Sequence, residues 1–115
     1  MKVIYRNQTA EKQFSSAYQS KWKYPAEVAV KLRAAENFIN AAANLQDIAN
    51  YRPFNFHKLR GDRKNEWSIS LGKTGYRVTL IPCDGEGNTI TTGDIMAQCK
   101  TVKVVMVTEV SNHYE

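Results

Sequence analysis

The segment from Phe56 to Arg63 (FHKLRGDR) places a histidine among cations and a glycine. A histidine can take a proton from a hydroxyl group near neutral pH. Arg60 and Arg63 can each donate two parallel hydrogen bonds to a phosphate. Together with His57, these side chains suit chemistry on a phosphodiester. Taken alone, the segment is more simply explained as a basic surface loop with an exposed histidine.

Two further groups offer an anion clamp and a proton donor. Arg77 lies in the alternating segment 76–81 (YRVTLI), on the face opposite Tyr76, Val78 and Leu80. His113 and Tyr114 directly follow the strongest predicted strand, 101–110. Taken singly, Arg77 fits a solvent-facing strand position, and the 113–114 pair fits a frayed tail.

One small sheet could bring these three groups to a single basic cleft. Cleavage of RNA by its own 2′-hydroxyl needs one group that removes the proton, one that stabilises the phosphorane and one that protonates the leaving oxygen. His57, Arg77 and the His113–Tyr114 pair could fill these roles with no metal and no cofactor. The roles of base and acid remain interchangeable between the two histidines.

The elements that must position these residues follow from hydrophobic periodicity. Strands are predicted over 2–6, 66–71, 76–81 and 101–110, with brief pairing over 89–92. One helix is predicted from Thr9 to about 21–24, with Ala10, Phe14 and Ala17 on its apolar face. A second, with Pro25 in its first turn, carries an apolar stripe of Val28, Leu32, Ala35, Ile39 and Ala42. The order β-α-α-β-β-β predicts an α+β fold, with both helices packed on one face of a mostly antiparallel sheet.

Length and composition predict one domain over residues 1–115. Apolar residues make up 43% of the 115 positions, which is enough for a core. The longest apolar runs fall far short of the roughly 20 residues of a membrane span, and 1–10 lack a signal-peptide core. We therefore expect a cytoplasmic protein with no membrane association. Cys83 and Cys99 lack the CxxC spacing of a zinc site and are expected to be reduced thiols, although a hairpin disulfide is sterically conceivable.

The net charge of +5 is concentrated in the middle of the chain. Residues 58–77 hold six Lys or Arg and two Asp or Glu, a net charge of +4 in 20 positions. This focus favours an anionic partner, with nucleic acid first. An ordinary solvated face explains the same charge.

The runs FHKLRGDRKNEWSISL and YRVTLI resemble the RelE/ParE toxin superfamily, and specifically its HigB-like branch. That branch shows a similar pattern in the middle of the chain and ends in a strand followed by a short tail with His or Tyr, which NHY matches. The element order agrees over essentially the whole chain, so the resemblance implies a RelE-like fold.

The resemblance implies the toxin of a bacterial toxin–antitoxin system, a ribosome-dependent endoribonuclease (mRNA interferase) that cleaves mRNA in the A site and inhibits translation. By analogy, His57 is the general base or orients it, and Arg77 binds the scissile phosphate. His113 and Tyr114 donate a proton and stack on or orient the nucleobase. The implied RNA contacts are Lys58, Arg60, Arg63, Lys64 and Lys73. Arg60 stands where the family usually has Lys, and arginine cannot release its proton at neutral pH. The expected partners are the ribosome, mRNA and a cognate helix-turn-helix antitoxin in a hetero-oligomer.

Two other functions fit the same residues. A ParE-like inhibitor of DNA gyrase would share the fold without needing the histidines. A simple binding module would use its cationic face only to dock an acidic partner. Each tryptophan also has two possible roles. Trp67 alternates with Ile69 and Leu71, which favours the core over base stacking, whereas Trp22 fits either the core or a partner-facing position.

Overall fold

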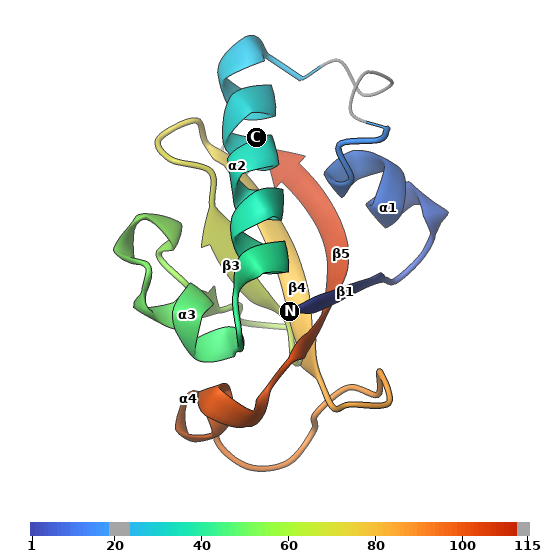
Figure 1. The fold of residues 1–115 in the computed structure, drawn as a ribbon, viewed down its shortest axis with the longest axis vertical. Coiled ribbons are helices and arrows are strands. Elements are labelled where there is room, and N and C mark those ends of the chain that lie inside the picture. The colour runs from blue at the N-terminus through green and yellow to red at the C-terminus, as the bar shows by residue number, and fades with distance from the viewer. Residues whose placement is uncertain (19–23, 113–115) are drawn as a thin grey trace.

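The computed structural model describes residues 1–18 and 24–112 (Figure 1). Within these ranges, five strands form one mixed sheet in the order β1-β5-β4-β3-β2. The β1 and β5 strands run parallel and the other neighbours are antiparallel. The predicted α+β class with a mostly antiparallel sheet is therefore confirmed. The strands are β1 (Lys2–Tyr5), β2 (His57–Lys58), β3 (Trp67–Ser70), β4 (Tyr76–Cys83) and β5 (Val104–Asn112).

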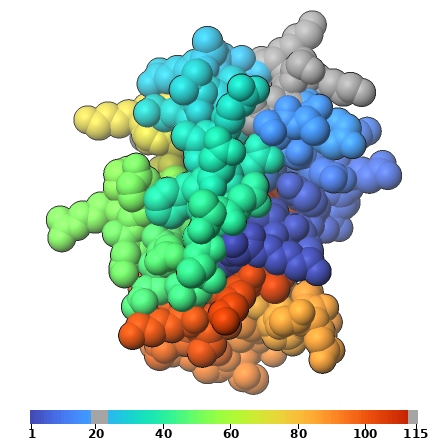
Figure 2. Space-filling view, in the orientation of Figure 1, coloured from blue at the N-terminus to red at the C-terminus, as the bar shows by residue number. Residues whose placement is uncertain are grey.

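The helices in the described part of the chain are α1 (Gln8–Phe14), α2 (Ala26–Ala41), α3 (Leu45–Asn50) and α4 (Ile95–Gln98), with 3₁₀ turns η2 (Arg52–Phe54) and η3 (Cys99–Thr101). Figure 1 shows α2 lying across one face of the sheet, with α1 beside the β1–β5 edge and α4 at the end of the sheet. In the space-filling view, α2 runs down the middle of the front, between the green α3–η2 segment and the blue N-terminal segment (Figure 2). None of the helices in 1–18 and 24–112 is long and apolar enough to cross a bilayer.

The first helix is shorter than the sequence predicts, so the expectation that it continues to 21–24 is wrong. It ends at Phe14, and Ser15 turns to an extended conformation. The next amide, on Ser16, donates to the Glu36 carboxylate on α2 at 3.0 and 3.2 Å. This tie to α2 replaces the next helical turn, and Ala17 is consequently exposed rather than on the apolar face.

The second helix matches its predicted stripe, because Val28, Leu32, Ala35 and Ile39 are all buried. Pro25 occupies the N-cap position rather than the first turn. The sequence does not predict α3. Its cap is Asn44, whose side chain accepts from the Gln46 amide at 3.0 Å, and the Leu45 amide donates to the Val102 carbonyl at 2.9 Å.

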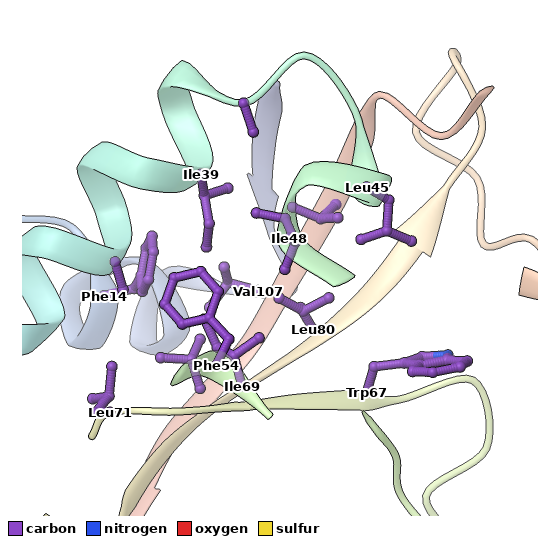
Figure 3. Close-up of a cluster of buried hydrophobic side chains, with 14 of the residues drawn as sticks. Phe14, Ile39, Leu45, Ile48, Phe54, Trp67, Ile69, Leu71, Leu80 and Val107 are labelled. Carbon is purple, nitrogen blue, oxygen red and sulfur yellow. The ribbon is translucent and has the colours of Figure 1, made fainter. Parts of the chain in front are cut away.

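The core lies between the helices and one face of the sheet. Figure 3 shows side chains from both layers meeting there, among them Phe14, Ile39 and Ile48 from the helices and Ile69, Leu80 and Val107 from the strands. Trp67, 8% exposed, is part of this cluster and stacks on Phe56 with ring centroids 4.6 Å apart, which confirms its predicted burial. The prediction for Trp22 lies outside the described residues.

The segment 83–100 closes one end of the sheet. Thr89 forms an isolated bridge with Cys83, as the predicted brief pairing requires, and Ile90 and Ile95 pack against the core. The α4 helix in this segment was not predicted. Cys83 and Cys99 are buried free thiols in separate apolar clusters.

The other face of the sheet has an apolar cluster of Ile81, Cys83 and Val104 at one end and a polar part at the other end. Strand alternation and the register of β3, β4 and β5 place six side chains there: Ser68, Ser70, Arg77, Thr79, Glu109 and Ser111. The predicted division of β4 is confirmed, because Tyr76, Val78 and Leu80 belong to the core cluster or pack against it. We call this surface the polar face. It holds the candidate site.

Candidate active site

His57 and Arg77 line one open hollow of about 160 Å³ on the polar face. His57 comes from the edge strand β2 and Arg77 from β4, and β3 lies between these strands. The remaining lining consists of Asn55, Ser68, Ser70, Gly72, Gly75 and Tyr76. Two residues that the sequence singles out by type, 20 positions apart, thus line the same hollow.

The ring of His57 is held by its own loop. Its Nδ1 lies 2.7 Å from the carbonyl oxygen of Asn55. Because a carbonyl only accepts, Nδ1 must carry a hydrogen, and Nε2 is the nitrogen at which the ring gains or loses a proton. Asn55 can present its carbonyl this way because it adopts the left-handed conformation (φ 46°, ψ 50°), which asparagine tolerates better than most residues.

Arg77 sits within the sheet rather than at its edge. Its register partners are Ser70 on β3 and Ser111 on β5, so small hydroxyl side chains flank it on both sides. Neighbours of this size leave room around a guanidinium. A guanidinium in such a hollow presents donors in a fixed fork that matches two phosphate oxygens.

The β3–β4 turn forms one wall of the hollow. Thr74 fixes the turn, because its hydroxyl donates to the Leu71 carbonyl at 2.8 Å and accepts from the Tyr76 amide at 3.1 Å. Gly72 adopts φ +59°, and a Cβ there would lie 2.6 Å from Lys31 Cε of α2. The Lys31 side chain of α2 therefore lies against Gly72 of the turn.

Tyr76 also lines the hollow, and a second tyrosine packs against its ring. Tyr76 packs edge-to-face with Tyr24, with ring centroids 5.8 Å apart. The Tyr24 hydroxyl donates to the Gln13 carbonyl at 3.0 Å. Burial raises the pKa of Tyr24 to about 12, with a smaller contribution from Tyr76, so Tyr24 stays protonated and keeps this hydrogen bond.

Ser68 is a residue of the hollow that sequence reasoning missed. It is 1% exposed, lies opposite His57 on one side and Thr79 on the other, and its Oγ has no hydrogen-bond partner among the described residues. Buried hydroxyls are nearly always satisfied in folded proteins. The alternation of β3 alone could not reveal this residue, because its environment depends on the pairing with β2.

The predicted RNA-contacting cations divide between two ends of the β3–β4 hairpin. Lys58, Arg60 and Lys64 are exposed on β2 and the loop that follows it, whereas Lys73 is exposed in the turn beside Gly72. Lys58 pairs with Trp67 and so lies on the opposite side of β2 from His57. The first and last Cα atoms of the four-residue β3 lie about 10 Å apart, and this length separates Lys73 from the other three cations.

Arg63 has protein partners. Its guanidinium binds the Glu66 carboxylate at 2.9 and 3.0 Å and Glu109 at 2.8 Å. The hydrogen bonds and charge of Arg63 are the main cause that holds the pKa of Glu66 below its usual value, and Glu66 in turn raises the pKa of Arg63. Contact of Arg63 with RNA stays a prediction beside this structural role.

His113 and Tyr114 lie outside the described residues. Asn112, the last described residue, is the register partner of Tyr76, so the described part of β5 reaches a residue of the hollow. Within 1–18 and 24–112, no three His, Cys, Asp or Glu side chains gather closely enough to hold a metal ion. Comparison of the chain with protein-family models and with curated proteins gives no match.

Proposed function

We propose that this protein is an endoribonuclease toxin of a bacterial toxin–antitoxin system, which cleaves mRNA in the ribosomal A site and so inhibits translation. The observation that carries the proposal is the shared hollow of His57 and Arg77. It joins a group able to take a proton with a group able to hold a phosphate. The described lining contains no carboxylate, so its charge favours an anion.

The reaction uses the RNA, His57, Arg77 and one acid. His57 Nε2 takes the proton of a 2′-hydroxyl, and the 2′-oxygen attacks the adjacent phosphorus. Arg77 stabilises the phosphorane charge by donating to its non-bridging oxygens. The bond from phosphorus to O5′ then breaks, and O5′ takes a proton from an acid, a role we assign to the His113–Tyr114 pair. The products are a 2′,3′-cyclic phosphate and a 5′-hydroxyl.

The assignment to HigB-like toxins of the RelE/ParE superfamily rests on sequence. The motif around His57 and the YRV segment carry it. The run of antiparallel strands β2 to β4 is consistent with it, whereas three helices rather than two lie between β1 and β2 among the described residues. A free toxin that acts on ribosomes would arrest the growth of its own cell, so the cell must inhibit it. We therefore propose a helix-turn-helix antitoxin as its partner in a hetero-oligomer in the cytoplasm.

The test is cleavage of a defined mRNA on translating ribosomes, with the cut sites and end groups mapped. Wild-type protein should cut within A-site codons, while His57→Ala and Arg77→Ala should each lose activity. A matched control is Lys103→Ala, which removes an exposed cation at the opposite end of β5 from the hollow and should cut normally. Intact message with the wild type would refute the proposal.

The same variants distinguish the ribonuclease from a ParE-like inhibitor of gyrase. A ParE-like inhibitor would poison supercoiling by gyrase, and His57→Ala would stay toxic. The plain binding module gives a third result, in which neither hollow variant changes anything but reversal of the Arg60 and Arg63 charges abolishes binding.

A further inference from the structure

A second hollow opens on the polar face, beside the part of β5 that follows its pairing with the edge strand β1, with a volume of about 440 Å³. Its charged lining consists of Arg6, Arg63, Glu66 and Glu109. A β-bulge shapes it. Thr79 lies opposite Glu109 and Leu80 opposite Val107, which leaves Thr108 as the extra residue of β5. Bulges commonly re-aim side chains next to functional sites.

The two hollows suit different chemical groups. The one around Arg77 has a cation and, in its described lining, no carboxylate. The second has two arginines balanced by two glutamates among the residues that the structure describes. A phosphate gains little from a balanced set of charges, whereas a neutral polar ring can use both its donors and its acceptors there.

The Glu109 carboxylate of the second hollow is both held in place and accessible, because it ends a network that begins at Glu66. The Glu66 side chain, 8% exposed, holds the Arg63 guanidinium with two bonds and accepts from Thr108 Oγ1 at 2.8 Å. Arg63 then donates to Glu109 Oε1 at 2.8 Å. The Glu109 side chain remains 41% exposed, so its acceptors face the hollow in an orientation that the network sets.

The two hollows are close enough for one RNA strand to enter both. Arg77 is the register partner of Ser111, so Glu109 is its diagonal neighbour on the same face. Diagonal neighbours of an antiparallel pair have Cα atoms about 7–8 Å apart. A nucleotide whose phosphate lies against Arg77 can therefore reach the second hollow with its own base or an adjacent one.

We propose that the second hollow is a nucleobase-recognition subsite that selects guanine next to the scissile phosphate, with Glu109 as its specificity-determining residue. This inference rests on the proposed ribonuclease function. Guanine presents two neighbouring donors, N1–H and the N2 amino group, which match the two oxygens of a carboxylate. Uracil presents one donor between two carbonyls that a carboxylate repels, and Arg6 can donate to guanine O6.

The experiment maps the base next to each cut on translating ribosomes for wild type, Glu109→Gln and the exposed-carboxylate control Glu86→Gln. The wild type and Glu86→Gln should favour guanine over uracil by about tenfold or more, the size of one good bidentate contact. Glu109→Gln should lose that preference, because its amide offers only one acceptor. The thermal midpoint of each variant shows whether a change comes from unfolding instead. No guanine preference in the wild type, or an unchanged preference in Glu109→Gln, would overturn the inference.

A titration that needs no cleavage separates this inference from the proposed function. Guanosine and uridine 5′-monophosphates are added to the full-length His57→Ala protein and to His57→Ala with Glu109→Gln, and amide NMR shifts are followed. The inference expects guanosine to bind more tightly than uridine, with shifts at Thr108 and Glu109, and only in the protein that keeps Glu109. Equal binding of both nucleotides would overturn it even if the wild type cuts RNA. If the wild type does not cut RNA, the titration still shows whether the protein prefers guanosine or binds both nucleotides equally.

Discussion

Glutamine in place of Glu66 tests the network that holds the second hollow. The Glu66 carboxylate accepts two bonds from Arg63 and one from Thr108. A glutamine keeps one oxygen for Thr108 but turns an amino group toward the guanidinium. Breaking a fully buried ion pair costs about 3–5 kcal/mol, and an exposed pair is worth about 0.2–1 kcal/mol. Because the Arg63 side chain is 34% exposed, we expect a loss of about 2 kcal/mol.

Urea unfolding followed by circular dichroism measures this loss. With a denaturant slope of about 1–3 kcal/mol per molar for a small domain, the midpoint should fall by roughly 1 M at pH 7. The pKa of Glu66 in the folded protein lies below its ordinary value of 4.5, mainly because of Arg63. Its contribution to stability is therefore complete above about pH 4.5 and is lost as pH falls through the lowered pKa. The gap between wild type and variant should accordingly shrink in acid.

A loss under about 0.5 kcal/mol at pH 7, the range of neutral surface changes, would refute this reasoning. A gap that stays constant as the pH falls through the acid range would refute the electrostatic part. The control is Glu86→Gln, which removes an exposed carboxylate in the Asp84–Gly87 turn and should leave the midpoint unchanged.

Two further predictions concern the turn and the thiols. Gly72→Ala should destabilise the protein by about 1 kcal/mol in the same unfolding assay, because φ is +59° there and the new Cβ would meet Lys31. The control Gly85→Ala, which has open space around the new Cβ, should leave the stability unchanged. Burial raises the pKa of Cys83 and of Cys99, so iodoacetamide at pH 8 should label them slowly in the folded protein and fully in urea. Rapid labelling of the folded protein would contradict their burial.

Strong local periodicity explains which elements could be predicted. The strands around Ile69 and Val78 and the helix around Leu32 carry enough apolar residues at fixed spacing to be found from sequence alone. The α3 helix has only Leu45 and Ile48 buried, and the pairing of Leu45 with Val102 that helps to hold it is a long-range contact. A short element that depends on tertiary contacts leaves little signal in its own sequence.

The same distinction applies to the candidate site. His57 and Arg77 are found by residue type, because few side chains can hold a proton or a phosphate. Ser68 and Glu109 are ordinary residues in the sequence. Their place near the site follows only from strand register, since one row of the sheet contains His57, Ser68, Thr79 and Glu109. Register depends on how whole strands pair, and so the bulge at Thr108 could not be anticipated.

The most direct test of the account is the single-turnover rate of cutting ribosome-bound mRNA by wild type and by His57→Ala. Wild-type protein should leave 2′,3′-cyclic phosphate ends, and removal of the base should slow the reaction by about 10²–10⁴-fold with RNA binding retained. Wild-type protein that leaves the message intact, or a His57→Ala variant that cuts at the wild-type rate, would contradict the account.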